Sequence, residues 1–404
     1  MKKTFLKAAL LSLTTIATFT ITSCSNDDNR DGNDNGNGGN PSATINPADF
    51  KGSIASGTTV TLDPSETYQL TGKLVVEEGA SLIIPAGTQV VAAEGSTYLI
   101  VDRGGKIFIN GTESDPVVFE GASHQPGYWG GIVLLGNAPS NRSASGTSTS
   151  ELGDMVYGGT NKEDNSGSIN YLVIKDSGFK YNPEKEFNGL SLFGVGSGTT
   201  ISHVYVTDGA DDGIEFFGGN VNVDHIVVTG VGDDSVDWTE GWQGSASYIY
   251  AARKKEYFDA TEPGNRGIEA DTQDTDPTTT FGNGVSNPAI KNATFIGNLK
   301  GSESQGLKLR AGSQGKFDNI VIANFNTGLD FETERTTDWF TSGNYITNIN
   351  FVSVPTVWAS EDIDMSEVFS INPEASGAGN GTALPDWAKN WTGLTEFDVA
   401  DAGN

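Results

Sequence analysis

The side chains whose types and spacing suggest chemistry are carboxylates in two similar segments. GADDGIEFF at residues 209–217 is matched, 22 residues later, by VGDDSVDWT at residues 231–239. Each segment carries an Asp-Asp pair and another acidic residue three positions on. With one further glutamate they make an acidic cluster, defined here as Asp211, Asp212, Glu215, Asp233, Asp234, Asp237 and Glu269.

Crowded carboxylates of this kind allow three kinds of chemistry. They can hold a cation, and Ca²⁺ is the expected one because it accepts carboxylate and carbonyl oxygens in flexible geometry. Its expected ligands are Asp211, Glu215, Asp233 and Asp237. They can also share protons at raised pKa and serve as catalytic acids and bases. The third interpretation is a hydrated surface cluster, because Asp beside Gly is also common in turns.

Basic and aromatic side chains flank the acidic cluster in the repeat. Lys308 and Arg310 follow it at one end. Phe193 and Phe217 lie toward its other end and are expected to form an exposed platform for stacking. Together with Glu215, Asp237 and Glu269, these residues form the predicted ligand-binding surface.

The elements that must position these residues are the coils of a solenoid. A repeat of about 22 residues, with short β-rich runs separated by Gly and Asp, predicts an all-β, right-handed parallel β-helix. Insertions in the turns explain its irregular spacing. We expect the β-helix over residues 46–360. Residues 361–404, with Trp387 and Trp391, are expected to cap an open end, because an uncovered sheet edge invites pairing.

Stacking the repeats assigns each strand position to a side of the sheet, since side chains alternate. Two columns are apolar and must point inward. The column between them must point outward, and it contains Val133, Ser191, Glu215, Asp237, Glu269, Lys308 and Asp330. A glycine-rich column precedes it, marking either close approach of a ligand or a bend. His203 and His225 share a turn column with asparagines, which favours a structural stack over a metal site.

The amino-acid composition of the chain argues against several classes of function. The chain has 404 residues, 24 basic against 52 acidic side chains, and a net charge of −28, which argues against nucleic acid as a partner. With 52 glycines and 19% charged residues, it is typical of a turn-rich β protein. A single cysteine excludes a disulfide framework. Three histidines without a His-Glu-x-x-His motif give little support to zinc or Ser-His catalysis.

The N-terminus predicts export and a lipid anchor. Residues 1–23 have a basic start and a short apolar stretch, as in a signal peptide. Ile21-Thr22-Ser23-Cys24 resembles a bacterial lipobox, which makes Cys24 the expected acylation site and attaches the protein to a membrane. Residues 24–45, rich in Asn, Asp and Gly, predict a disordered tether. Its acidic start resembles the export signal of Bacteroidetes surface lipoproteins, so we expect the protein on the outer membrane, facing outward.

Longer motifs carry a wider resemblance. YWGGIVLLGNAP, GADDGIEFFGG, RGIEAD and LPDWAKNWTG resemble a family of Bacteroidetes surface lipoproteins with the pectin-lyase-like β-helix fold. A more distant resemblance, to polygalacturonases, rests on Asp211-Asp212-Gly213, Gly232-Asp233-Asp234 and Leu307-Lys308-Leu309-Arg310. It implies that Asp212, Asp233 and Asp234 act as acid and base and that Lys308 and Arg310 bind an acidic sugar, which makes these five residues the catalytic candidates. No histidine follows Asp234, however, and Lys and Arg stand in reversed order.

Three functions fit these observations. The first is a surface-anchored, non-catalytic protein whose β-helix face binds a glycan or a protein partner, with or without calcium. The second is a polysaccharide lyase or glycoside hydrolase acting on an acidic polysaccharide. The third is a structural or accessory subunit of an outer-membrane complex. The incomplete catalytic pattern favours the first.

Overall fold

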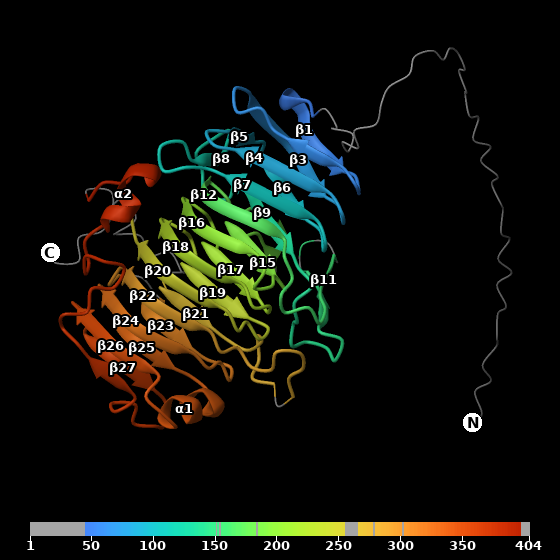
Figure 1. The fold of residues 1–404 in the computed structure, drawn as a ribbon. Coiled ribbons are helices and arrows are strands. Elements are labelled where there is room, and N and C mark those ends of the chain that lie inside the picture. The colour runs from blue at the N-terminus through green and yellow to red at the C-terminus, as the bar shows by residue number, and fades with distance from the viewer. Residues whose placement is uncertain are drawn as a thin grey trace, which may run out of the picture. The chain divides into compact units, whose positions relative to one another are not determined.

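The computed structural model describes residues 45–150, 152, 155–182, 185–254, 266–277, 279–300 and 303–396. Among these, 24 strands belong to a single sheet that winds as a parallel β-helix (Figure 1). The predicted fold is therefore confirmed. The signal peptide, Cys24 and nearly all of the tether lie outside the described residues, as do residues 397–404 of the tail. No described helix combines the length and apolar character that crossing a bilayer requires.

Each coil presents three faces. Most coils contain one strand that bends between faces 1 and 2: β12 (Gly167–Lys175), β16 (Thr200–Thr207), β18 (Asn222–Thr229), β20 (Ser245–Ala252), β22 (Ala289–Ile296), β24 (Lys316–Ala323), β26 (Ile346–Val352) and the short β28 (Phe369–Ile371). In the first coils these two faces are separate strands. They are β2 (Thr59–Thr61), β4 (Ser81–Pro85) and β7 (Lys106–Asn110) on face 1, and β5 (Gln89–Ala92) and β8 (Val117–Gly121) on face 2.

Face 3 contains the remaining strands of the stack. They are β1 (Phe50–Ile54), β6 (Gly95–Val101), β9 (Trp129–Leu135), β15 (Leu190–Phe193), β17 (Ile214–Phe217), β19 (Val236–Thr239), β21 (Ile268–Ala270), β23 (Gln305–Leu309), β25 (Thr327–Phe331) and β27 (Thr356–Ser360). Strand β3 (Thr67–Val76) bends from face 2 to face 3. The short 3₁₀ helix η1 (Pro47–Asp49) precedes the first coil.

The register of face 3 confirms the predicted columns. Ile214 pairs with Val236, Glu215 with Asp237, and Phe216 with Trp238. Along the apolar columns the side chains are at most 2% exposed: Ile132, Leu190, Ile214, Val236, Ile268, Leu307, Leu329, and Leu134, Leu192, Phe216, Trp238, Leu309, Phe331. Strand alternation therefore places these columns in the core, and the acidic residues between them face outward.

The corner between faces 1 and 2 explains the His and Asn column. Every residue there has a φ of 49–57°: Tyr171, His203, His225, Tyr248, Asn292, Asn319 and Asn348. Asparagine tolerates this left-handed conformation better than most residues. The left-handed conformation therefore explains why asparagine recurs along this column, which also contains Tyr171 and Tyr248.

The glycine column lies where the chain turns onto face 3, against the next coil. A Cβ atom at Gly213 would lie 2.6 Å from the carbonyl oxygen of Ser235, and one at Gly306 would lie 2.6 Å from that of Gly328. Both glycines are buried. Close approach of the neighbouring backbone therefore explains this column, and no ligand is needed.

Two hairpins in the described part of the chain, and the tail, pack outside the coils. The hairpin of β10 (Thr147–Thr149) and β11 (Val156–Gly158) belongs to an insertion that packs on face 3 through Leu152 and Tyr157. A second hairpin joins β13 (Lys180–Asn182) to β14 (Lys185–Glu186). Helix α1 (Glu334–Thr341) buries Phe340 in the main core.

The tail differs from the expected end cap. Met365, in the last coil, is buried in the main core. The following segment, with α2 (Asp386–Thr392), lies instead along the side of the central coils, next to β18 (Figure 1). There Trp391 belongs to a buried apolar cluster with Val173, Tyr205 and Val227. The prediction that Trp387 and Trp391 cap an end is wrong, because their apolar partners are on the flank.

Candidate functional site

The acidic cluster is assembled by three successive coils. Asp211 and Asp212 lie in the turn before β17, and Asp233 and Asp234 lie in the matching turn before β19. On face 3, Glu215 pairs with Asp237, and Asp237 pairs with Glu269. The sequence repeat therefore brings the predicted residues together, with Lys308 next in the same column.

Burial separates the aspartates of the two turns. Asp212 is 6% exposed and Asp234 is 1% exposed, whereas the side chain of Asp233 is 46% exposed. The Oδ1 atom of Asp212 accepts a hydrogen bond from the backbone N–H of Asp234 at 2.8 Å. A simple hydrated surface cluster is therefore excluded for Asp212 and Asp234, because both residues are almost completely removed from water.

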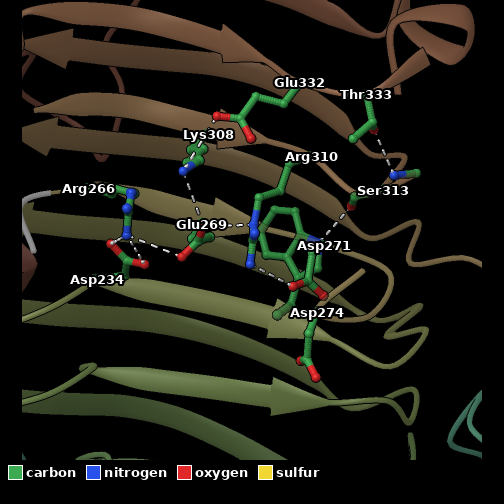
Figure 2. Close-up of polar contacts among 12 residues, drawn as sticks. Asp234, Arg266, Glu269, Asp271, Asp274, Lys308, Arg310, Ser313, Glu332 and Thr333 are labelled. Atoms are coloured by element: carbon green, nitrogen blue, oxygen red, sulfur yellow. Dashed lines mark hydrogen bonds and ion pairs between the residues drawn. The ribbon is translucent and has the colours of Figure 1, made fainter. Parts of the chain in front are cut away.

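A buried arginine that the sequence argument did not single out organises one end of the cluster. The Nη1 atom of Arg266 lies 3.2 Å from Asp234 and 3.2 Å from Glu269, and Nη2 lies 2.8 Å from Glu303 (Figure 2 shows the first two). The Arg266 side chain is only 7% exposed. It supplies the positive charge that these carboxylates need once they are removed from water.

The sequence does contain a signal for Arg266. Arg266 precedes Gly267 in the same way that Asp212 precedes Gly213 and Asp234 precedes Ser235. Backbone hydrogen bonds join these positions from coil to coil. Each residue of this column stands three positions before an outward residue of face 3. Alignment of the column would have shown an arginine stacked directly on two aspartates.

Lys308 and Arg310 complete the network on the other side of Glu269. Arg310 contacts Glu269 at 2.8 Å and Asp271 at 3.2 Å, while Lys308 contacts Glu269 at 3.8 Å and Glu332 at 3.5 Å (Figure 2). Both basic side chains therefore already neutralise carboxylates of the protein, which limits the charge that they can offer to an acidic sugar.

The spacing of the carboxylates fits a cation best around Asp212. Oxygens of Asp212, Glu215 and Asp237 all lie within 4.8 Å of one another. Two oxygens that share one Ca²⁺ at 2.3–2.6 Å can be separated by no more than about 5 Å, so this group meets the requirement. Oxygens of Asp211, Asp212 and Asp233 form an overlapping group. The four predicted calcium ligands are thus divided between two groups that share Asp212.

An unpartnered oxygen distinguishes the group around Asp212 from the one at Arg266. Oδ1 of Asp237 is buried and has no hydrogen-bond partner among the described residues. Glu215 accepts a hydrogen bond from Asn188 at 2.5 Å. Between Asp234 and Glu269 the guanidinium already occupies the place of a cation. Chemically, the Asp212 group can therefore take up a divalent cation or protons.

The pKa values of these carboxyl groups also indicate that the group takes up a cation or protons. Burial, followed by the charges of Asp211 and Asp234, raises the pKa of Asp212 well above its usual value. Burial and the neighbouring Glu269 do the same to the pKa of Asp237. Burial raises the pKa of Asp233 to about 6, although Arg266 opposes the shift. These carboxylates hold protons at unusually high pH unless a cation replaces them.

The prediction of an exposed aromatic platform is wrong. Phe193 is 1% exposed and Phe217 is 8% exposed, and their rings stack at 3.9 Å with an interplanar angle of 10°. The ring of Tyr157, from β11, packs on Phe193 at 5.0 Å. The insertion between β9 and β12 therefore covers both phenylalanines, and neither is available for stacking on a sugar.

The catalytic assignment implied by the polygalacturonase resemblance also conflicts with the geometry. Asp212 and Asp234 are buried, and Asp234 is paired with Arg266. A polysaccharide could not contact them without rearrangement of the turns. Of the three aspartates, only Asp233 combines an exposed side chain with a pKa near neutrality.

Comparison with known proteins identifies the architecture. A family model described as a pectate-lyase-like β-helix domain matches residues 52–392. No curated protein and no solved structure matches the chain.

Proposed function

Because the chain belongs to the family of pectate-lyase-like β-helix domains, we propose that it is a non-catalytic, surface-anchored protein that binds Ca²⁺ at Asp212, Glu215 and Asp237 and thereby an anionic glycan. The observation that carries this proposal is the close approach of three carboxylates with a buried, unpartnered oxygen on Asp237. Anchoring to the outer membrane through Cys24 is part of the proposal and rests on the sequence.

Calcium would supply the positive charge that the three carboxylates of the proposed site lack. When bound, the ion would neutralise the three carboxylates and leave coordination positions toward solvent, since Ca²⁺ takes six to eight oxygens. Carboxylates of an acidic polysaccharide are suitable ligands for those positions. Glu215 and Asp237 are half-buried and outward-facing on face 3, so the ion would be reachable from outside. Asp212, from the turn, would hold it from within.

The calcium site is tested by unfolding the full chain in EDTA and in excess Ca²⁺. At a concentration of about 100 times the dissociation constant, calcium should raise the free energy of unfolding by about 2.7 kcal/mol. Asp237→Asn should abolish this gain. In EDTA the same variant should be at least as stable as the wild type, because burial and Glu269 disfavour the ionised form of Asp237 and asparagine cannot ionise. Asp330→Asn, in the same column beyond Lys308, is the matched control and should keep the gain.

The glycan is tested with polygalacturonate as the probe. Binding to the full chain should require Ca²⁺, disappear in EDTA and be lost in Asp237→Asn. Calcium binding without polygalacturonate binding would contradict the glycan part of the proposal. Absence of any calcium effect on stability would contradict the site itself. Release of unsaturated or reducing ends from the polysaccharide would identify the chain as a lyase or hydrolase.

The raised pKa values also predict an unusual dependence of stability on pH. In the folded state Asp233 titrates at about 6 and Asp271 at about 7, and the pKa values of Asp212 and Asp237 are raised as well. Their unfolded pKa is about 4, so the folded protein binds more protons between these values. This contribution is complete below about pH 4 and is lost as the pH rises through 6 and 7.

In EDTA, therefore, the urea concentration at the midpoint of unfolding should decrease as the pH rises from roughly 5 to 8. Ordinary salt-bridged carboxylates give the opposite trend. Saturating Ca²⁺ should flatten this dependence, because the ion replaces the protons, and the affinity for Ca²⁺ should increase with pH. A midpoint that rises over this interval in EDTA would show that the carboxylates are ionised and already neutralised in the folded protein.

A further inference from the structure

A second group of polar side chains lies at the corner between faces 1 and 2, away from the acidic cluster. There the rings of Tyr171, His203, His225 and Tyr248 form a continuous stack on four successive coils. The ring centroids are 4.2, 4.4 and 4.8 Å apart in that order, and the two imidazoles are parallel to within 5°. Both imidazoles are half-buried, so they remain accessible from solvent.

A carboxylate and a hydroxyl connect the two imidazoles. Nδ1 of His203 lies 2.8 Å from Oγ of Ser202, which donates to Oδ1 of Asp224 at 2.7 Å. The same oxygen lies 2.5 Å from Nδ1 of His225. One donor atom from each of His203, Asp224 and His225 lies within 4.8 Å of the other two. Two nitrogens and one oxygen therefore converge at the surface.

The fold does not require histidine at these two positions. The equivalent corners of later coils are Asn292, Asn319 and Asn348, which adopt the same left-handed conformation at φ of 54–57°. Asparagine thus satisfies the backbone alone. The imidazoles add metal-binding nitrogens on two adjacent coils, and Asp224 directly precedes the second of them.

We propose that His203, Asp224 and His225 bind a transition-metal ion of the Zn²⁺ or Cu²⁺ class at this corner. Imidazole nitrogen is a preferred ligand of these ions, whereas Ca²⁺ and Mg²⁺ select oxygen donors, so this site and the acidic cluster take different metals. Tilting of the imidazoles out of their parallel stack would bring the three donors to about 2.0–2.2 Å from one ion, and water would complete the tetrahedron.

The tail provides an optical probe at the site. The ring of Trp387 stands edge-on to His225 at 4.9 Å, and that of Trp391 stands edge-on to His203 at 5.8 Å. A paramagnetic ion such as Cu²⁺ bound between the imidazoles would lie next to both indoles and quench their fluorescence. The chain has seven tryptophans, so the quenching should be partial.

The test uses the full chain, freed of metal with EDTA and dialysed. Calorimetric titration with Zn²⁺ should show one equivalent that the double variant His203→Asn, His225→Asn loses or binds at least about tenfold more weakly. Cu²⁺ should quench part of the tryptophan fluorescence in the wild type and not in the double variant. The asparagines should preserve the fold, because asparagine occupies the same corner in later coils.

Two controls separate this site from other donors. His124→Ala removes the remaining histidine, which lies 3.1 Å from Asp176, and it should bind Zn²⁺ as the wild type does. Asp237→Asn alters the acidic cluster, and it should keep the equivalent of Zn²⁺ that the double variant loses. Unchanged Zn²⁺ stoichiometry and affinity in the double variant, or Cu²⁺ quenching that survives in it, would overturn the proposal.

Discussion

Replacing Arg266 with methionine should destabilise the protein by about 3–5 kcal/mol at neutral pH, a cost typical of breaking a buried ion pair from one side. Arg266 contacts Asp234, Glu269 and Glu303 and is itself buried. Methionine fills much of the same volume but leaves Asp234, at 1% exposure, without its positive partner. Urea unfolding followed by tryptophan fluorescence would measure the loss.

The double variant Arg266→Met, Asp234→Asn is the control for this prediction. It removes both charges, so most of the lost stability should return. The loss in the single variant should also shrink as the pH falls, because Asp234 then becomes protonated. A loss below about 1 kcal/mol in Arg266→Met would show that the pair is exposed to water in solution and contributes like an ordinary surface salt bridge.

Truncation of the stacked phenylalanines should have an effect of similar size. Phe193→Ala and Phe217→Ala should each cost about 3–5 kcal/mol, because each leaves a cavity beneath the insertion that carries Leu152 and Tyr157. Glycan affinity measured on the folded variants should remain unchanged, since neither ring is exposed. Chemical denaturation and polygalacturonate binding, performed on the same samples, separate the two readouts.

Phe281→Ala is the matched control, because the Phe281 side chain is 41% exposed. Truncating it should change stability by no more than about 0.5 kcal/mol. If Phe193→Ala were equally mild and also weakened glycan binding, the insertion would have to leave face 3 in solution, and the exposed aromatic platform would be restored.

Much of the fold followed from local patterns. The 22-residue offset placed Glu215 beside Asp237, and Ile214 beside Val236, as the strand pairing confirms. Alternation along each strand then decided which of these faced the core. Both inferences depend only on the period of a β-strand and the repetition of one coil, and these properties survive insertions in the turns.

The candidate site was only partly predictable, because the sequence argument depends on repetition. Its members were found because they repeat, but their environment depends on segments that do not repeat. Phe217 faces outward as expected and is nevertheless covered, because an insertion far back in the sequence packs over it. Trp391 was expected at an end and lies on the flank, beside Tyr171 and His203.

The β-helix, its inward and outward columns and the gathering of the acidic residues can therefore be inferred from the amino-acid sequence, because they follow from short-range periodicity. Three features emerge only from the folded structure: Asp212 and Asp234 are buried, Arg266 neutralises one end of the acidic cluster, and His203, Asp224 and His225 meet beside two tail tryptophans. These features depend on the packing of residues distant in the chain, and no periodicity encodes such packing.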